Sequence, residues 1–205
     1  MSTGADEIDA DLRHVDWYGR DIGGTRFTGC DLTGATLEEA VGTGCVFEEC
    51  DFTEVRLNGS EWTDAAFLRC RFRGASFFGA TLRGCKLTGS RFEETCTLRP
   101  LLVEGGDWSY VTVRHQDLRG LDLSGVRMRD IDVTGADLRE TVLRDADLGN
   151  ATFHDTRLRG ADLRGARLLG VDLKKLELDD VHLDVTQAVQ LAMCHGAEVD
   201  WASFA

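Results

Sequence analysis

The sequence predicts an all-β fold in which the chain coils regularly, with four short sides to each turn, and ends in a short helix. Three observations support this prediction. A large apolar residue recurs at every fifth position, a mostly small side chain stands two residues before it, and residues 184–196 carry helix start and stop signals. Because a period of five fits neither a helix nor a flat strand, the chain must turn at regular intervals.

The large apolar series runs in steps of five from Leu12 to Phe92, resumes after one inserted residue at Leu98, and ends at Leu183. Of its 35 positions 34 are apolar, whereas the overall hydrophobic content of 42% would give about 15. We therefore predict that residues 1–183 form one repeat domain with a register shift near 93–100.

The second column, two residues before each large side chain, holds six of the seven cysteines: Cys30, Cys45, Cys50, Cys70, Cys85 and Cys96. We interpret these as reduced thiols that pack as small apolar groups. If each pentapeptide forms one side of a square coil, both columns point inward and fill each layer without a cavity. Nearly nine coils at ~4.8 Å per layer would give a rod ~42 Å long.

Two positions break the pattern. The inserted residue lies close to Pro100, the only proline. Since proline has no N–H to donate to a ladder, we predict a bulge or kink at Pro100 and a bend in the rod. Gly42 occupies a large apolar position and should leave its layer underfilled unless Val41 or Val46 shifts inward.

The C-terminal helix is predicted from Asp184 as N-cap, Gln187 as its capping-box partner and Gly196 as the stop signal. A helix over about 185–195 places five apolar side chains on one stripe: Val185, Ala188, Val189, Ala192 and Met193. This stripe could cap the last coil or bind a second subunit. We therefore interpret residues 184–205 as cap and dimer interface, to which Trp201 and Phe204 add apolar area.

Composition excludes several classes of function. No apolar run is long enough for a membrane span, and the acidic residues Asp6, Glu7, Asp9 and Asp11 are the reverse of a signal peptide's basic start. We expect a cytoplasmic protein that does not bind membranes. With 23 basic and 36 acidic residues, the net charge of −13 argues against direct nucleic-acid binding and favours a basic partner surface.

We find no motif that predicts catalysis. The histidines and cysteines share no metal-ligand spacing, and no nucleophile or phosphate-loop motif is present. A convex rod also offers no cleft that would shift the pKa of a general acid. We predict that the protein is not an enzyme and holds neither metal nor cofactor. Only an unexpected cleft near Gly42 or Pro100 would favour an enzymatic function.

The charge is distributed unevenly. Residues 1–64 carry 15 acidic and 4 basic side chains, a net charge of −11, while residues 65–98 carry +4 and residues 99–205 carry −6. One interpretation is a solvated surface that keeps the rod soluble. The other is imitation of a nucleic acid, because two rods joined at their C-terminal ends would carry one charge per ~3.3 Å, half the density of duplex DNA.

Three segments carry a family resemblance: Ala136-Asp137-Leu138-Arg139, Ala146-Asp147-Leu148-Gly149 and Ala161-Asp162-Leu163-Arg164-Gly165. They resemble the A(D/N)LXX repeat of the pentapeptide-repeat family. This resemblance implies a right-handed quadrilateral β-helix with four pentapeptides to a coil.

The second half is similar, more specifically, to the mycobacterial MfpA-like group of fluoroquinolone-resistance proteins within this family. The similar segments are residues 98–101, 117–123, 142–148 and 184–189. The resemblance implies a homodimer, joined through the C-terminal helix, that mimics DNA, binds DNA gyrase and protects it from fluoroquinolones. The alternative is a structural interaction rod with a partner other than a topoisomerase.

By this analogy eight aspartates would face gyrase: Asp11, Asp31, Asp51, Asp117, Asp122, Asp137, Asp147 and Asp162. A basic belt at residues 69–91 interrupts the acidity and departs from a uniform DNA mimic. It comprises Arg69, Arg71, Arg73, Arg83, Lys86 and Arg91.

Overall fold

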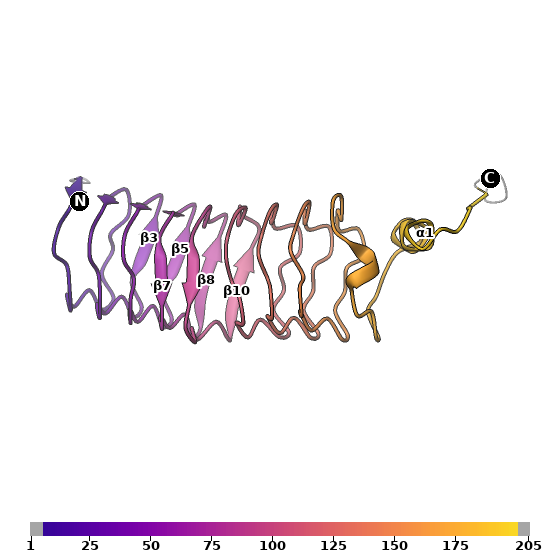
Figure 1. The fold of residues 1–205 in the computed structure, drawn as a ribbon. Helices are drawn as coiled ribbons and strands as arrows, with labels where there is room; N and C mark the ends of the chain where they lie inside the picture. Colours follow the sequence, from indigo (N-terminus) through magenta and orange to yellow (C-terminus); the bar gives the residue numbers. More distant parts are fainter. Residues whose placement is uncertain (1–5, 201–205) are drawn as a thin grey trace.

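In the computed structural model, which describes residues 6–200, the chain forms a rod of stacked coils with its two ends at opposite tips (Figure 1). The strands are β1 Glu7–Ile8, β2 Arg26–Thr28, β3 Val41–Thr43, β4 Val46–Glu48, β5 Glu61–Thr63, β6 Ala66–Leu68, β7 Arg71–Arg73, β8 Ala80–Arg83, β9 Arg91–Glu93 and β10 Leu101–Glu104. A 3₁₀ helix, η1 Leu173–Lys175, and the α-helix α1 Val185–Cys194 follow. None of the described helices is long and apolar enough to cross a membrane.

The coils stack as parallel ladders. Three sheets have the orders β1-β2-β4-β6, β10-β8-β5-β3 and β7-β9. Apart from the β10–β8 pair, strand residues pair with those 20 residues away, as Phe27 does with Phe47 and Phe47 with Phe67. Isolated bridges extend the ladder to Asp162 and His182. A 20-residue step is four pentapeptides, so the predicted right-handed quadrilateral β-helix with a C-terminal helix is confirmed.

One pentapeptide, residues 31–35, shows why the repeat is stable. The amide of Asp31 donates to Ala10 in the preceding coil, and the amides of Leu32 and Gly34 donate to Asp51 and Thr53 in the next coil. The amide of residue 35 donates to Leu32 across the turn, and that of residue 33 donates to the side chain of Asp31. All five N–H groups are therefore satisfied, as burial of a backbone requires.

The interior is filled by the two predicted columns. In the N-terminal half, the rings of Phe27, Phe47 and Phe67 stack, with centroids 4.6 and 5.2 Å apart and planes within 7° of parallel. The small column is buried as well, including all six of its cysteines. Leu12 and Leu183, at the two ends of the series, are only half-buried because no further coil covers them.

The expectation for Gly42 is wrong in its detail. Val41 is 38% exposed and Val46 remains half-buried, so neither fills the layer. The ring of Trp62, one coil further on, takes the space instead: a Cβ at position 42 would lie 2.4 Å from two of its ring carbons. The absence of a side chain at Gly42 makes room for the large Trp62 ring, and the layer is filled.

The register shift near 93–100 falls in the turn at residues 93–95. Across it the ladder offset becomes 21 residues, as in the bridges of Ser76 with Thr97 and Arg91 with Thr112. Pro100 lies one pentapeptide later, at an exposed turn position, where its carbonyl accepts the amide of Gly79 at 2.7 Å. Pro100 therefore does not mark the register change, and a bend of the rod there stays a prediction.

The last coil departs from the predicted repeat. After Gly170 one side is replaced by η1, and Leu178, expected in the inward column, is only half-buried. The ladder returns at His182, whose amide donates to Ala161.

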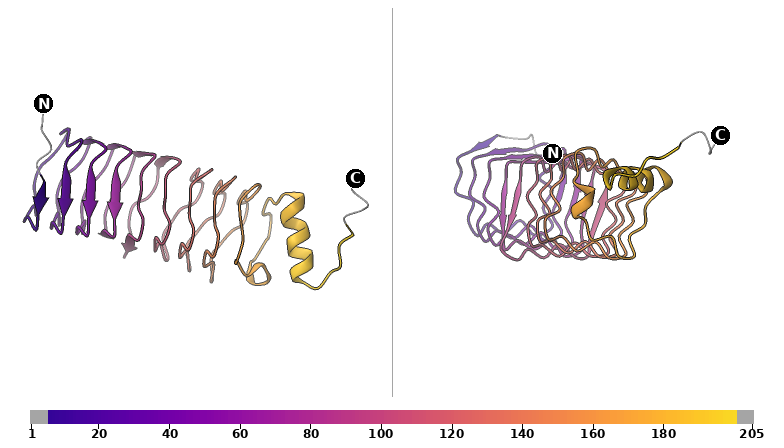
Figure 2. Two further views of the ribbon diagram at one scale, coloured as in Figure 1. Left: turned by 90° about the horizontal axis from the view of Figure 1, so that it is seen from above. Right: turned by 45° about the vertical axis from the view of Figure 1, so that its right-hand side comes forward.

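Helix α1 crosses the end of the stack (Figure 2) and begins as predicted. The Asp184 carboxylate accepts the Gln187 amide at 2.9 Å, and the Asp184 amide donates to the Gln187 side chain at 3.0 Å. Gly196, with a φ of 91°, follows the C-terminal end of the helix. The capping face is not the predicted apolar stripe: Gln187 is buried and Leu191 packs on the core, whereas Val185 is 69% exposed.

The apolar stripe of α1 instead faces solvent in this single chain. Met193 is 52% exposed and Ala188 is also exposed, while Val189 and Ala192 are half-buried. Trp201 and Phe204 lie outside the described residues.

Candidate protein-interaction surface

The eight predicted aspartates first of all build turns. In each, Oδ1 accepts the backbone N–H two residues further on, at N···O distances from 2.8 to 3.3 Å. Sequence reasoning missed this role, although aspartate in a fixed column before a turn is a known signal for it. Asparagine would make the same bond, so turn formation does not account for the negative charge.

The structure does not bring all eight aspartates to one face. Asp11, Asp31 and Asp51 pair in the ladder and form one file, as the period predicts. Asp117 and Asp137 form a second file. Asp122 and Asp162 belong to a third, and Asp147 to a fourth. The five predicted aspartates of the second half are therefore spread over three sides of the rod.

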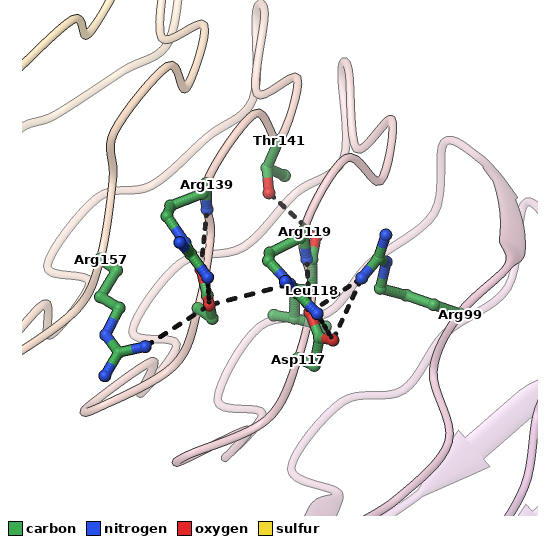
Figure 3. A network of polar contacts seen from close by, with 8 residues as sticks. Arg99, Asp117, Leu118, Arg119, Arg139, Thr141 and Arg157 are labelled. Carbon is green, nitrogen blue, oxygen red and sulfur yellow. Dashed lines mark hydrogen bonds and ion pairs between the residues drawn. The ribbon is translucent and has the colours of Figure 1, made fainter.

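In the second half, arginines neutralise many of these carboxylates (Figure 3). Asp117 binds Arg119 at 2.7 Å and Arg99 at 3.1 Å, and Asp137 binds Arg139 at 2.6 Å with Arg157 at 3.8 Å. The hydrogen bond from Arg119 holds the pKa of Asp117 well below its usual range. This side is a mixed ladder of both charges rather than the acidic surface expected there.

Asp162 is neutralised in the same way. It is largely buried and lies 2.7 Å from Arg164 and 2.5 Å from Arg144. The hydrogen bond from Arg164, followed by that from Arg144, lowers the pKa of Asp162. A partner protein would have to displace these arginines to use the charge.

The first three coils differ from the rest. Acidic side chains stand on all four of their sides: Asp11, Asp31, Asp51 and Glu54; Asp16, Glu38 and Glu39; Asp21, Glu61 and Asp64; and Glu7, Asp9, Glu48 and Glu49. The four basic residues of residues 6–64 are all engaged, Arg13, Arg26 and Arg56 in ion pairs and Arg20 over the Trp17 ring. This segment, the acidic coils, covers residues 6–64.

The charge density of the acidic coils can be compared with that of DNA. Three layers at ~4.8 Å span ~14 Å, so a net charge of −11 amounts to one charge per ~1.3 Å. Duplex DNA carries one per ~1.7 Å. The remaining residues, 65–205, hold 21 acidic and 19 basic side chains, so nearly all of the excess negative charge lies at one end of the rod.

The basic belt at residues 69–91 compensates neighbouring acids. Arg69 binds Glu49 at 2.9 Å and also Glu48, and Arg71 binds Glu93 at 2.7 Å. Arg73 and Arg83 form ion pairs in the same manner. Among the described residues of the belt, only Lys86 and Arg91 have no carboxylate within 4 Å, so the belt is not a continuous positive stripe.

The structure places a groove at Pro100, one of the two positions where a cleft would bear on catalysis. This open groove of about 760 Å³ is lined by residues 95–101 and 117–122, but its Asp117 and Arg119 are paired with each other. Burial raises the pKa of the Cys45 thiol to about 12, and that of Cys85 to about 11. Within residues 6–200 no three metal-ligating side chains come together.

Comparison with known proteins supports the architecture. Models of the pentapeptide repeat match residues 21–96 and, as eight repeat copies, residues 117–155, together more than half of the chain. No curated protein matches the sequence. The solved structure of full-length QnrB1, a plasmid-mediated fluoroquinolone resistance protein, is similar with a TM-score of 0.72, 20% identity and coverage of 95% of this chain and 98% of that chain.

Two trypsin-treated variants of QnrB1 give TM-scores of 0.66 and 0.64, again at 20% identity and covering 96% of this chain and 98% of those chains. The fold and its surface thus define a four-sided solenoid with a strongly acidic end. The chain belongs to the pentapeptide-repeat family.

Proposed function

We propose that this protein is a non-enzymatic, cytoplasmic DNA mimic that binds DNA gyrase, inhibiting it, protecting it from fluoroquinolones or another gyrase poison, or both. The observation that carries the proposal is the charge of the acidic coils, which reaches the linear density of duplex DNA on all four sides. A groove that binds DNA without reading its sequence recognises this density. The resemblance to resistance proteins of the MfpA-like group, and the likeness in fold to QnrB1, support gyrase as the partner.

The alternative is an interaction rod with another basic partner. The near-neutral second half favours this alternative, because a mimic of a long duplex would carry charge along its whole length. Supercoiling by purified gyrase, titrated with the protein with and without a fluoroquinolone, distinguishes the two. We expect inhibition at micromolar protein or rescue of gyrase under drug, and no effect on gyrase would exclude the proposal.

A pair of double variants tests which carboxylates matter. In Asp16→Asn and Asp21→Asn combined, the turn bonds to the amides of Tyr18 and Gly23 are kept, while two charges of the acidic coils that have no described arginine or lysine within 4 Å are lost. We expect gyrase binding about tenfold weaker, with a shallower dependence on salt. Surface plasmon resonance at several salt concentrations measures both quantities.

The matched control combines Asp117→Asn and Asp137→Asn, which also keeps the turn bonds. It should bind gyrase within about twofold of the wild type, because both charges are already neutralised by arginine. Equal losses in the two variants would contradict the assignment to the acidic coils.

We further propose that the protein is a homodimer joined through the exposed stripe of α1. Val189→Asp and Met193→Asp would each bury a charge without a partner at that joint and should give monomers. Both positions lie away from the buried face of α1 formed by Gln187 and Leu191, so the cap itself should persist. Sedimentation velocity reports the mass, and variants that stay dimeric would show that α1 is a cap alone.

A further inference from the structure

One corner of the rod carries two exposed aromatic side chains, Tyr18 in the acidic coils and Phe78 in the coil that follows them. Tyr18 is 58% exposed and Phe78 is 56% exposed. Each directly follows an inward apolar residue, and the two are 60 residues apart, so they share one corner three layers apart, ~14 Å along the rod. Packing of the core does not explain two large aromatic rings that are exposed to solvent at matching positions, and such exposed apolar groups often mark a binding site.

A shallow groove of about 330 Å³ lies between the two rings. Glu38, Glu39 and Asn58 line it, together with Gly59 and Gly79. The two glycines leave the backbone as its floor: a Cβ at position 79 would have only the Gly59 amide within 4 Å, at 3.8 Å. A side chain from another molecule can therefore approach the backbone between the rings.

The two carboxylates of the groove differ. Glu38 is compensated, with Arg56 at 3.4 Å and the Asn58 amide group at 3.1 Å. Glu39 accepts the hydroxyl of Tyr18, which raises the pKa of Tyr18, and none of the described lysines or arginines lies within 4 Å of it. An anionic oxygen without a cation thus sits next to an exposed ring.

We propose that this aromatic groove binds an arginine side chain of a basic protein partner. The guanidinium stacks on an aromatic face and forms a forked pair with Glu39, which a lysine ammonium does less well. The surrounding net charge of −11 attracts such a partner, and the rings supply the apolar contact that long-range attraction lacks. The inference rests on the proposed function only in taking gyrase as that partner.

A peptide titration tests the groove without gyrase. Blocked Gly-Arg-Gly, Gly-Lys-Gly and Gly-citrulline-Gly are added to the full-length protein, and NMR follows the ring protons of Tyr18 and Phe78. We expect the arginine peptide to shift both rings, the lysine peptide to shift them less and the neutral citrulline peptide not to shift them. Arginine shifts that are no larger here than at acidic turns elsewhere would overturn the proposal.

Gyrase binding provides the second test. Tyr18→Ala and Phe78→Ala should each weaken binding about tenfold, whereas Leu102→Ala and Leu169→Ala, which truncate other exposed apolar side chains, should leave it unchanged. If gyrase binds the aromatic variants as tightly as the wild type, the groove is not the anchor although the proposed function stands. If gyrase does not bind the wild type, the proposed function fails and the peptide titration alone decides. A change in sedimentation of the aromatic variants would instead make the groove a contact between copies.

Discussion

Phe67→Ala is expected to destabilise the protein by about 3–5 kcal/mol. Phe67 is 1% exposed, and its ring contacts those of Phe47 and Trp62 at centroid distances of 5.2 Å each. Phe52 and Phe72 lie at 5.7 and 5.9 Å. Truncation therefore opens a cavity at the centre of the aromatic stack, and a domain with about 5–15 kcal/mol of stability would lose about a fifth or more of it.

Urea unfolding followed by tryptophan fluorescence measures this loss. The matched control is Phe78→Ala, which removes the same ring from an exposed position and should change stability by less than about 0.5 kcal/mol. Because each coil contacts only its neighbours, we expect the damage in Phe67→Ala to be greatest in the adjacent coils. Similar unfolding midpoints for the two variants would show that the aromatic stack is not the main source of stability.

Gln187→Ala is expected to cost about 2–4 kcal/mol, the second largest effect. The Gln187 side chain is 3% exposed and donates to the carbonyls of Leu163 at 2.5 Å and Ala166 at 2.9 Å, while accepting the Asp184 amide. Alanine would leave all three groups without this partner at the end of the core. Buried polar groups without a partner cost more than the net value of the bonds.

The control for this experiment lies one turn away on the same helix. Gln190 is exposed, so Gln190→Ala should change the free energy of unfolding by less than about 0.5 kcal/mol. Hydrogen exchange should localise the effect of Gln187→Ala to residues 161–183, where amides near the cap become less protected. Unchanged protection in that segment would mean that Gln187 does not seal the end of the rod.

The fold was predictable because successive coils place the same two columns of side chains in the interior. The inward column at a period of five is visible in the amino-acid sequence alone, and so is the capping box at Asp184. The inward orientation of Gln187 is not, because the register of α1 on the last coil depends on tertiary packing. Gly42 is an intermediate case: its partner Trp62 stands 20 residues away, so a search at the coil period would have found it.

The candidate site was predicted in part for a related reason. The file of Asp11, Asp31 and Asp51 follows directly from the 20-residue step. The neutralisation of Asp117 and Asp137 follows from two spacings. Arg119 and Arg139 stand two residues after these acids in the same turn, and Arg99 and Arg119 precede them by 18 residues on the neighbouring coil. Selecting the aspartates without these arginines therefore overstated the acidity of this side.

On either side of the insertion at residues 93–95, the 20-residue step fixes how far each coil extends the rod. Adding or removing four pentapeptides would move its acidic tip away from or toward α1 by one layer, ~4.8 Å, without rotating any side, because every residue reappears on the same face. Five or ten extra residues would instead turn the tip by one or two corners. Duplication within such a gene can therefore change the length of the rod and the orientation of its acidic tip separately. One scaffold can in this way be fitted to partner proteins whose binding grooves differ in length.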